Sequence, residues 1–450
     1  MVEVYEPRGA RLRDSVGMEL RAAQLADVVG GRLDGPDVTI VGACIDSRSV
    51  RQGQLFVPVV AERNGHDFIS AALDAGAIAY LTSSPPLGGT AIVVDDTVRA
   101  LQAAGQHART RLGGTVIGIT GSVGKTSVKD LLSGVLAQRL RTAASERSFN
   151  NELGVPLTLL NAPEDSEAVV IEMGARDVGH IAALCQIAQP AIGLVTRVAA
   201  VHTEVFGTID DVARAKSELV RALPASGTAV LNAADPRVAS MAEVTDAAVL
   251  MFGNGGDVYA SDRILDESLR GRFTLHAPSG TIGIELAARG IHQVDNALAA
   301  AAAALVCGLS LDDVAAGLNE AVLSPWRMEL TTAPDGALVL NDAYNANPTS
   351  TAAALESLVA LPAARYIAVL GGMAELGPDS DEAHRDIGAI AARLGVRVIA
   401  VAAPAYGGEN VATVAEALDL LEPLGPGDAV LVKGSRVAGL ERLAELLLEE

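Results

Sequence analysis

The chain has 450 residues, of which 50% are hydrophobic and 20% are charged, and its formal net charge is −21. This charge disfavours nucleic-acid binding, which needs a concentrated basic surface. Polar residues, glycine and proline interrupt every apolar run before it reaches the roughly 20 residues of a membrane span. The first residues lack the apolar core of a signal peptide, and three scattered cysteines make neither a disulfide framework nor a zinc cluster. We expect a soluble, cytoplasmic protein of roughly three domains.

Residues 1–112 are predicted to form a small α/β domain. Short β-branched runs alternate with a helical pattern at 68–77, and a second helical stretch near 101–112 leads out of the domain. No catalytic constellation is visible in this part of the chain. The segment Asp46-Ser47-Arg48 fits a turn or a helix cap on local grounds.

The most informative stretch is 115–140, TVIGITGSVGKTSVKDLLSGVLAQRL. A β-branched run ends at Thr120, a glycine-rich turn follows, and the apolar residues after Lys125 recur at helical spacing. Backbone N–H groups of such a turn, together with the helix N-terminus, can bind phosphate. Lys125 could then reach the outer phosphates, and the Thr126 hydroxyl could hold Mg²⁺. The glycine spacing is shorter than in the usual phosphate loop, so a purely structural turn is the alternative.

This stretch opens a second predicted domain, 113–322, in which strands and helices alternate as in a parallel sheet. Ligands of such sheets gather at the carboxyl ends of the strands. Glu172 ends one predicted strand, and His202 lies in the loop after another. Both side chains would face the phosphate loop if their strands are its neighbours.

Lysine is rare in this chain. Only four of the 34 basic residues are lysines, so each is a candidate for a place that requires an amine. Lys216 falls within the apolar stripe of a predicted helix at 209–223. Its stem could extend to water, which the helix alone favours. If the amine is buried, it would instead favour the neutral form, which can take up CO₂ to give a carbamate.

The third predicted domain, 323–450, again alternates strands and helices but lacks the glycine fingerprint of dinucleotide-binding folds. Asp342 ends its first strand and is followed by Asn345 and Asn347, which could be only turn and cap residues. Lys433 follows the last strand and offers a cation to an anionic ligand. We expect the ligand site to lie in a cleft between the second and third domains.

Taken together and in order, the motifs resemble the Mur ligase family over essentially the whole chain. The resemblance is carried by TGSVGKT at 120–126, NNELGVP at 150–156, EMGA at 172–175, AKSE at 215–218, DAYNANP at 342–348 and VKGSR at 432–436. It implies three domains: a UDP-binding α/β domain, a central ATPase-like parallel-sheet domain and a C-terminal Rossmann-like domain.

The resemblance also implies an activity. Members of this family phosphorylate the terminal carboxylate of a UDP-linked muramoyl peptide with ATP, and an amine then attacks the acyl phosphate. The match implies UDP-N-acetylmuramoyl-tripeptide and D-alanyl-D-alanine as substrates, ATP and two Mg²⁺ ions as cofactors, and cell-wall peptidoglycan synthesis as the setting. We expect a monomer. The alternatives are a related ligase that uses another amine and a non-catalytic ATP-binding switch.

Site residues are implied one by one. The resemblance assigns ATP contacts to Thr120, Gly121, Ser122, Val123, Gly124, Lys125, Thr126, Ser127, Asn296, Arg327 and Asp342. It assigns one Mg²⁺ to Thr126 and Glu172, and a second to His202 and a carbamylated Lys216; with Lys125, these form the catalytic set. It assigns substrate contacts to Ser47, Arg48, Asn150, Asn151, Asn345 and Asn347. Two departures from the family pattern bear on these assignments, Gln293 for the usual Asn and Arg197 in the segment before His202.

Overall fold

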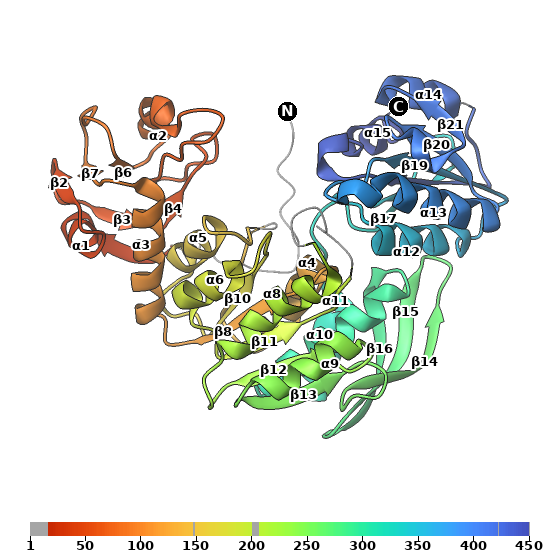
Figure 1. The fold of residues 1–450 in the computed structure, drawn as a ribbon, viewed down its shortest axis with the longest axis horizontal. Coiled ribbons are helices and arrows are strands. Elements are labelled where there is room, and N and C mark those ends of the chain that lie inside the picture. Colours follow the sequence, from red (N-terminus) through yellow and green to blue (C-terminus); the bar gives the residue numbers. More distant parts are fainter. Residues whose placement is uncertain (1–16, 147–148, 200–206, 422, 450) are drawn as a thin grey trace.

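The structure is a computed structural model that describes residues 17–146, 149–199, 207–421 and 423–449. Three larger sheets follow one another along the chain, each with helices packed on it, and the central one lies between the other two (Figure 1). The predicted α/β class is therefore confirmed. The predicted domain borders fall between sheets, after helix α3 and after helix α11. None of the described helices is long and apolar enough to cross a membrane.

The first sheet is small and has the order β2-β7-β6-β5-β4, with only β2 antiparallel to its neighbour. In the same stretch of sequence, β1 and β3 form a separate antiparallel pair. The long helix α3 leads from this unit to the central one (Figure 1). The elements are β1 Glu19–Arg21, α1 Ala22–Val28, β2 Arg32–Asp34, β3 Thr39–Val41, β4 Ala43–Cys44, β5 Leu55–Phe56, α2 Ile69–Asp74, β6 Ala79–Thr82, β7 Ala91–Val93 and α3 Thr97–Arg111.

The central sheet is entirely parallel and has the order β13-β12-β11-β8-β10-β9. Its strands are β8 Thr115–Thr120, β9 Thr142–Ala144, β10 Ala168–Glu172, β11 Ile192–Val195, β12 Thr228–Asn232 and β13 Ala248–Phe252. The helices are α4 Lys125–Leu136, α5 Gly154–Asn161, α6 His180–Ala188, α8 Ile209–Arg221, α9 Pro236–Ala239, α10 His292–Val306 and α11 Leu311–Glu320. β8 lies in the middle, so the loop after it is flanked by the ends of β10 and β11.

The sequence patterns did not predict a second, antiparallel sheet in this region. It consists of β14 Tyr259–Leu265, β15 Arg270–Ala277 and β16 Gly280–Arg289. The alternation of buried and exposed residues along β15 and β16 shows that one face packs inward while the other meets water. The buried face joins the core formed by the alanine-rich helix α10 and helix α4.

The third sheet has the order β17-β18-β22-β19-β20-β21, and β17 alone is antiparallel. Its strands are β17 Glu329–Thr332, β18 Leu338–Asn341, β19 Arg365–Gly371, β20 Arg397–Val401, β21 Glu409–Val411 and β22 Asp428–Lys433. Its helices are α12 Pro348–Val359, α13 Ser380–Arg393, α14 Val414–Leu421 and α15 Glu441–Leu446. β22 lies centrally, which places Lys433 at the carboxyl edge beside the end of β18.

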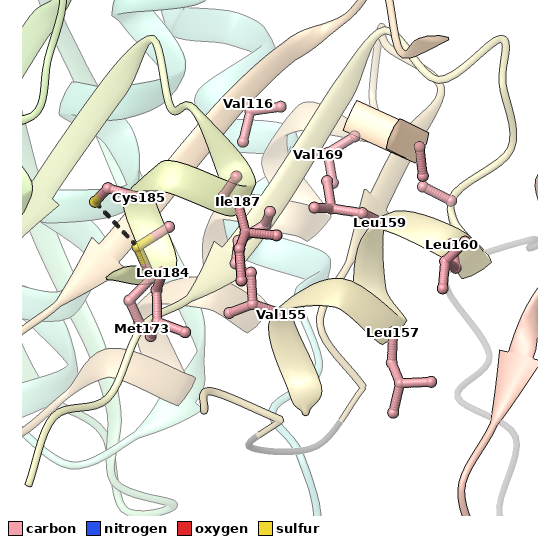
Figure 2. Close-up of a cluster of buried hydrophobic side chains, with 14 of the residues drawn as sticks. Val116, Val155, Leu157, Leu159, Leu160, Val169, Met173, Leu184, Cys185 and Ile187 are labelled. Atoms are coloured by element: carbon pink, nitrogen blue, oxygen red, sulfur yellow. Dashed lines mark hydrogen bonds between the residues drawn. The ribbon is translucent and has the colours of Figure 1, made fainter. Parts of the chain in front are cut away.

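The first and central units share one hydrophobic core. Helices α3, α5 and α6 pack together on β8 and β10, and Figure 2 shows the apolar side chains between them. Gly105 of α3 lies directly against α5, because a Cβ built at this glycine would be 2.4 Å from Cβ of Pro156. Real Cβ atoms do not approach so closely, so the helices can pack this tightly only with glycine at this position.

We predict that Gly105→Ala destabilises the protein although alanine favours helix formation. The new methyl would meet Pro156 of α5, and overpacking of this kind costs about 1–3 kcal/mol, more than the gain of about 1 kcal/mol in helix propensity. Thermal unfolding should therefore show a lower Tm. Gly113→Ala is the control, since nothing lies near its Cβ position. Equal melting temperatures of both variants would contradict the packing argument.

Candidate active site

A cavity of about 960 Å³ lies where the central and third sheets face each other. It is lined by the phosphate loop, by the segments after β10 and β11, by the start of α10 and by the segment after β18. These positions are the carboxyl ends of parallel strands and the N-terminal ends of helices, where backbone donors collect. Residues of α3 line it as well. The expected interdomain cleft is thus present.

The phosphate loop connects β8 to α4 as the sequence predicted. Gly121 and Gly124 have φ angles of 144° and 83°, conformations that favour glycine. A Cβ at Gly124 would also be 2.5 Å from Oδ1 of Asn296. Lys125 bends back over the loop, and its Nζ donates to the carbonyl oxygen of Gly121 at 2.7 Å. Burial is the main cause that lowers the pKa of Lys125, and the nearby Arg327 guanidinium lowers it further.

Glu172, at the end of β10, is fixed at both carboxylate oxygens. Thr126 donates its hydroxyl to one oxygen at 2.7 Å, and the Asn150 side-chain amide donates to the other at 2.7 Å. The carboxylate is 1% exposed. Hydroxyl and carboxylate oxygens are the ligands that Mg²⁺ prefers, so this pair suits the ion. Within the described residues, no three His, Cys, Asp or Glu side chains cluster as a metal site.

Lys216 lies in helix α8 and is only 2% exposed, so the expectation that its stem extends to water is wrong. Its side chain lines the same cavity as Lys125. Burial, and then the positive charge of Lys125, lower the pKa of Lys216 from 10.5 to about 7, against the opposing effects of Glu218 and Glu172. A large fraction of its amine is therefore neutral near pH 7.

The third sheet contributes an ion pair at the edge of the cavity. Lys433, 1% exposed, donates to the Asp342 carboxylate at 2.5 Å and to the carbonyl oxygen of Asn345 at 2.9 Å. Arg327 stacks over the Tyr344 ring at 4.1 Å, and its buried Nε has no hydrogen-bond partner in the part of the chain that the structure describes. All five residues line the cavity. Its third-sheet side therefore carries both aromatic and charged surface.

The start of α10 forms the opposite side. Asn296 donates its amide to Oε1 of Gln293 at 2.8 Å, so the residue that departs from the family pattern orients the predicted ATP contact. His292 is half-buried beside them; its Nδ1 has no hydrogen-bond partner among the described residues, and burial lowers its pKa. Arg197, the other departure, is exposed and lines the cavity.

The structure brings most of the predicted residues to this cavity, including Asn151, Asn347 and the loop residues 122–127. Thr120 instead donates its buried hydroxyl to the carbonyl oxygen of Met173 and supports the strand end, and neither it nor Gly121 is among the residues that line the cavity. Ser47 and Arg48 lie outside it, with Arg48 paired to Asp46 at 2.7 Å. His202 lies outside the described residues.

The sequence reasoning missed several cavity residues, among them Thr196 and Tyr344. Thr196 follows β11 and donates to the carbonyl oxygen of Val123 at 2.6 Å, which braces the phosphate loop from the neighbouring strand. Tyr344 provides the ring that holds Arg327. Position alone could have indicated both, because each follows the carboxyl end of a parallel strand.

The family models for the Mur ligase middle domain and for the Mur ligase glutamate ligase domain match residues 119–304 and 326–436. UDP-N-acetylmuramoyl-tripeptide--D-alanyl-D-alanine ligase from Mycobacterium bovis is 42% identical, over 96% of this chain and 98% of its own. The chain belongs to the Mur ligase family.

Solved structures of Mur ligases agree with this assignment. MurF from Acinetobacter baumannii has a TM-score of 0.87 at 31% identity, covering 96% of this chain and 100% of its own. MurF from Thermotoga maritima, in complex with ADP, has a TM-score of 0.79 at 28% identity, over 90% of this chain and 96% of its own. This Mur ligase therefore shares its three-part arrangement with these structures.

The lowered pKa of Lys216 predicts how stability changes with pH. Below about pH 7 its amine is charged in both the folded and unfolded protein, whereas between about pH 7 and 10.5 only the unfolded protein binds the proton. The cost of burying the ammonium is therefore relieved as pH rises, by about 1.4 kcal/mol per unit at most. Relative to Lys216→Met, the wild-type Tm should increase from pH 6.5 to pH 9.5 in CO₂-free buffer. A constant difference would contradict a lowered pKa.

Proposed function

We propose that this chain is the ATP-dependent ligase that joins D-alanyl-D-alanine to UDP-N-acetylmuramoyl-tripeptide, a step of peptidoglycan precursor synthesis. One observation carries the proposal: a single cavity, built around a phosphate loop, is lined from both sides. Helices α4 and α8 of the central unit contribute Lys125 and Lys216, and the third unit contributes Arg327 and Asp342. The M. bovis relative is named for this activity, and the structure of the T. maritima MurF is a complex with ADP.

The residues suit phosphoryl transfer followed by acyl transfer. ATP gives its γ-phosphoryl group to the terminal carboxylate of the tripeptide, forming an acyl phosphate and ADP. The amine of D-alanyl-D-alanine then attacks the acyl carbon, loses a proton, and expels phosphate as the amide forms. Lys125 would leave its contact with Gly121 and stabilise the charge on the transferring group. Asn296, Arg327 and Asp342 would hold the adenosine part in position.

A first Mg²⁺ would be held by Thr126 and Glu172, because both present oxygen ligands and already meet at 2.7 Å. Mg²⁺ at this position would supply neutralisation of the phosphate charge. Asn150 would keep the carboxylate in one orientation through its 2.7 Å hydrogen bond. The chain thus fixes this ligand before the ion binds.

A second Mg²⁺ would need a further carboxylate, and a carbamylated Lys216 would provide it. The neutral amine can attack CO₂, forming an N–C bond and losing one proton. The low pKa of Lys216 supports this chemistry near neutral pH. His202 stays the predicted partner of this group, although it lies outside the described residues.

The muramoyl substrate would extend from the first sheet to the cavity. Asn150 and Asn151 line the cavity just before α5, and α5 ends at Asn161, whose side chain pairs with both backbone groups of Ala43 at 2.9 and 3.0 Å. Ala43 lies shortly before the predicted UDP contacts Ser47 and Arg48. The relative positions of the two ends of the substrate path are therefore set by one short helix. Asn345 and Asn347 would contact the incoming dipeptide.

The assay that tests the proposal measures phosphate release from ATP in the presence of UDP-N-acetylmuramoyl-tripeptide. D-Ala-D-Ala should stimulate release strongly, and L-Ala-L-Ala should not. Stimulation by another amine but not by D-Ala-D-Ala would instead favour a ligase of a different peptide pathway. ATP binding with no release under any of these conditions would favour a nucleotide-binding switch. Monomeric state and cytoplasmic location stay predictions, which sedimentation and cell fractionation would check.

We expect Lys216→Ala to lower kcat by at least about 10²-fold, since it removes a group that acts on charge formed during transfer. Binding of a non-hydrolysable ATP analogue should be nearly unchanged. Arg214→Ala, on the exposed side of the same helix, is the matched control and should keep full activity. Undiminished turnover of Lys216→Ala would rule out the carbamate.

A further inference from the structure

Glu218 of helix α8 makes an unusual connection to helix α6. Its two carboxylate oxygens accept hydrogen bonds from the backbone N–H groups of Gly179 and Ala182, at 2.5 and 2.9 Å. These are donors at the N-terminus of α6, the end that carries positive partial charge. A side chain from one helix therefore caps another helix.

The acceptor comes from α8 because the residue at the N-cap position of α6, Gly179, provides no side-chain cap. Gly179 is the residue before the helix; it has φ 94° and no side chain to accept these bonds. A left-handed glycine here turns the chain sharply out of the preceding loop. Removing the carboxylate leaves the N–H groups of exposed Gly179 and half-buried Ala182 without this acceptor.

The loop that this cap fixes runs back to Glu172. It leaves β10 at Glu172, passes Gly174, whose N–H donates to the carbonyl oxygen of Asn150 at 2.7 Å, and enters α6 at Gly179. The α6 helix itself is seated by Leu184, Cys185 and Ile187 against Met173 and Val155 (Figure 2). Both ends of the loop are thus held, one by the sheet and the other by Glu218.

The other side of the connection carries Lys216. Residues two apart on a helix are rotated by about 200° about its axis and so point to nearly opposite sides. Glu218 can therefore accept the hydrogen bonds from α6 while Lys216 faces the cavity. The two hydrogen bonds of Glu218 add to the core packing of Val212, Leu219 and Val220 in fixing the rotation of α8 about its axis, and with it the direction of the lysine side chain. A single carboxylate therefore joins the two segments that supply Glu172 and Lys216.

We propose that Glu218 is a positioning residue of the ligase site, which holds Glu172 and Lys216 at a fixed separation by capping α6 from α8. The inference rests on the proposed function, because it assigns a purpose to the geometry of those two groups. Glu218 itself is not among the residues that line the cavity. Its contribution is to the spacing between the two proposed Mg²⁺ ligands.

The test compares Glu218→Ala and Glu218→Gln with Asp313→Ala. Asp313 is the control because its carboxylate also accepts a backbone N–H group at a helix start, that of Ser310 before α11, but away from the cavity. Binding of a non-hydrolysable ATP analogue is titrated against Mg²⁺, and the carbamate is followed by NMR in ¹³C-bicarbonate, with Lys216→Ala as the blank. Neither readout needs the amine substrate, so failure of the D-Ala-D-Ala assay is a separate result.

We expect Glu218→Ala to raise the Mg²⁺ concentration for half-maximal analogue binding about tenfold and to weaken the carbamate signal. Glu218→Gln, which keeps only one of the two oxygen acceptors, should recover part of both. Asp313→Ala should lower Tm without changing either readout. If Glu218→Ala lowers Tm but leaves the Mg²⁺ titration and the carbamate signal as in wild type, the cap is only structural and the proposal is overturned.

Discussion

The burial of two lysine amines in one cavity is the constraint on which the site depends. Lys125 and Lys216 each lose hydration, and the charge of the first disfavours a charge on the second. Glu172 lies near enough to oppose both effects but cannot cancel them alone. A polyanion such as a nucleoside triphosphate would supply the missing negative charge. Binding of phosphate groups would therefore relieve the repulsion between the amines.

The parallel sheet is what brings these groups together. β8 is flanked by β10 and β11, so the phosphate loop, Glu172 and Thr196 all follow strands that end at the same edge. Helices that start at this edge add their N-terminal donors. The third sheet repeats the arrangement, with Asp342 and Lys433 after two paired strands. Two carboxyl edges facing each other thus produce a cleft that neither sheet could form alone.

Strong local patterns predicted much of this. The phosphate loop and β8 could be predicted because a β-branched run, glycines and a helical period follow one another within residues 115–140, and the position of Glu172 because it ends a second apolar run. The antiparallel sheet at 259–289 was missed although β15 and β16 alternate between buried and exposed residues; only β14 alternates weakly, and the buried face of the sheet depends on α10. Burial of Lys216 could not be decided either: one helix face does not reveal what packs on it, and only tertiary contact excludes water from the amine.

The two interfaces of the central unit are built differently. The first unit shares a hydrophobic core with the central unit. In addition, the side chain of Asn161, at the end of α5, hydrogen-bonds the backbone of Ala43 in the edge strand β4. The connection to the third sheet is a short linker in which Trp326 and Met328 have φ angles of 61° and 54°, which cost about 1–2 kcal/mol each for such residues. Arg436 over the Trp326 ring helps to hold this conformation. Residues 112–114, which connect α3 to β8, have no such angle, so backbone strain distinguishes the second connection from the first. A rotation about the strained linker would leave the first interface intact. Such a rotation would carry Arg327 and Asp342 relative to the phosphate loop and leave Glu172 and Lys216 where they are.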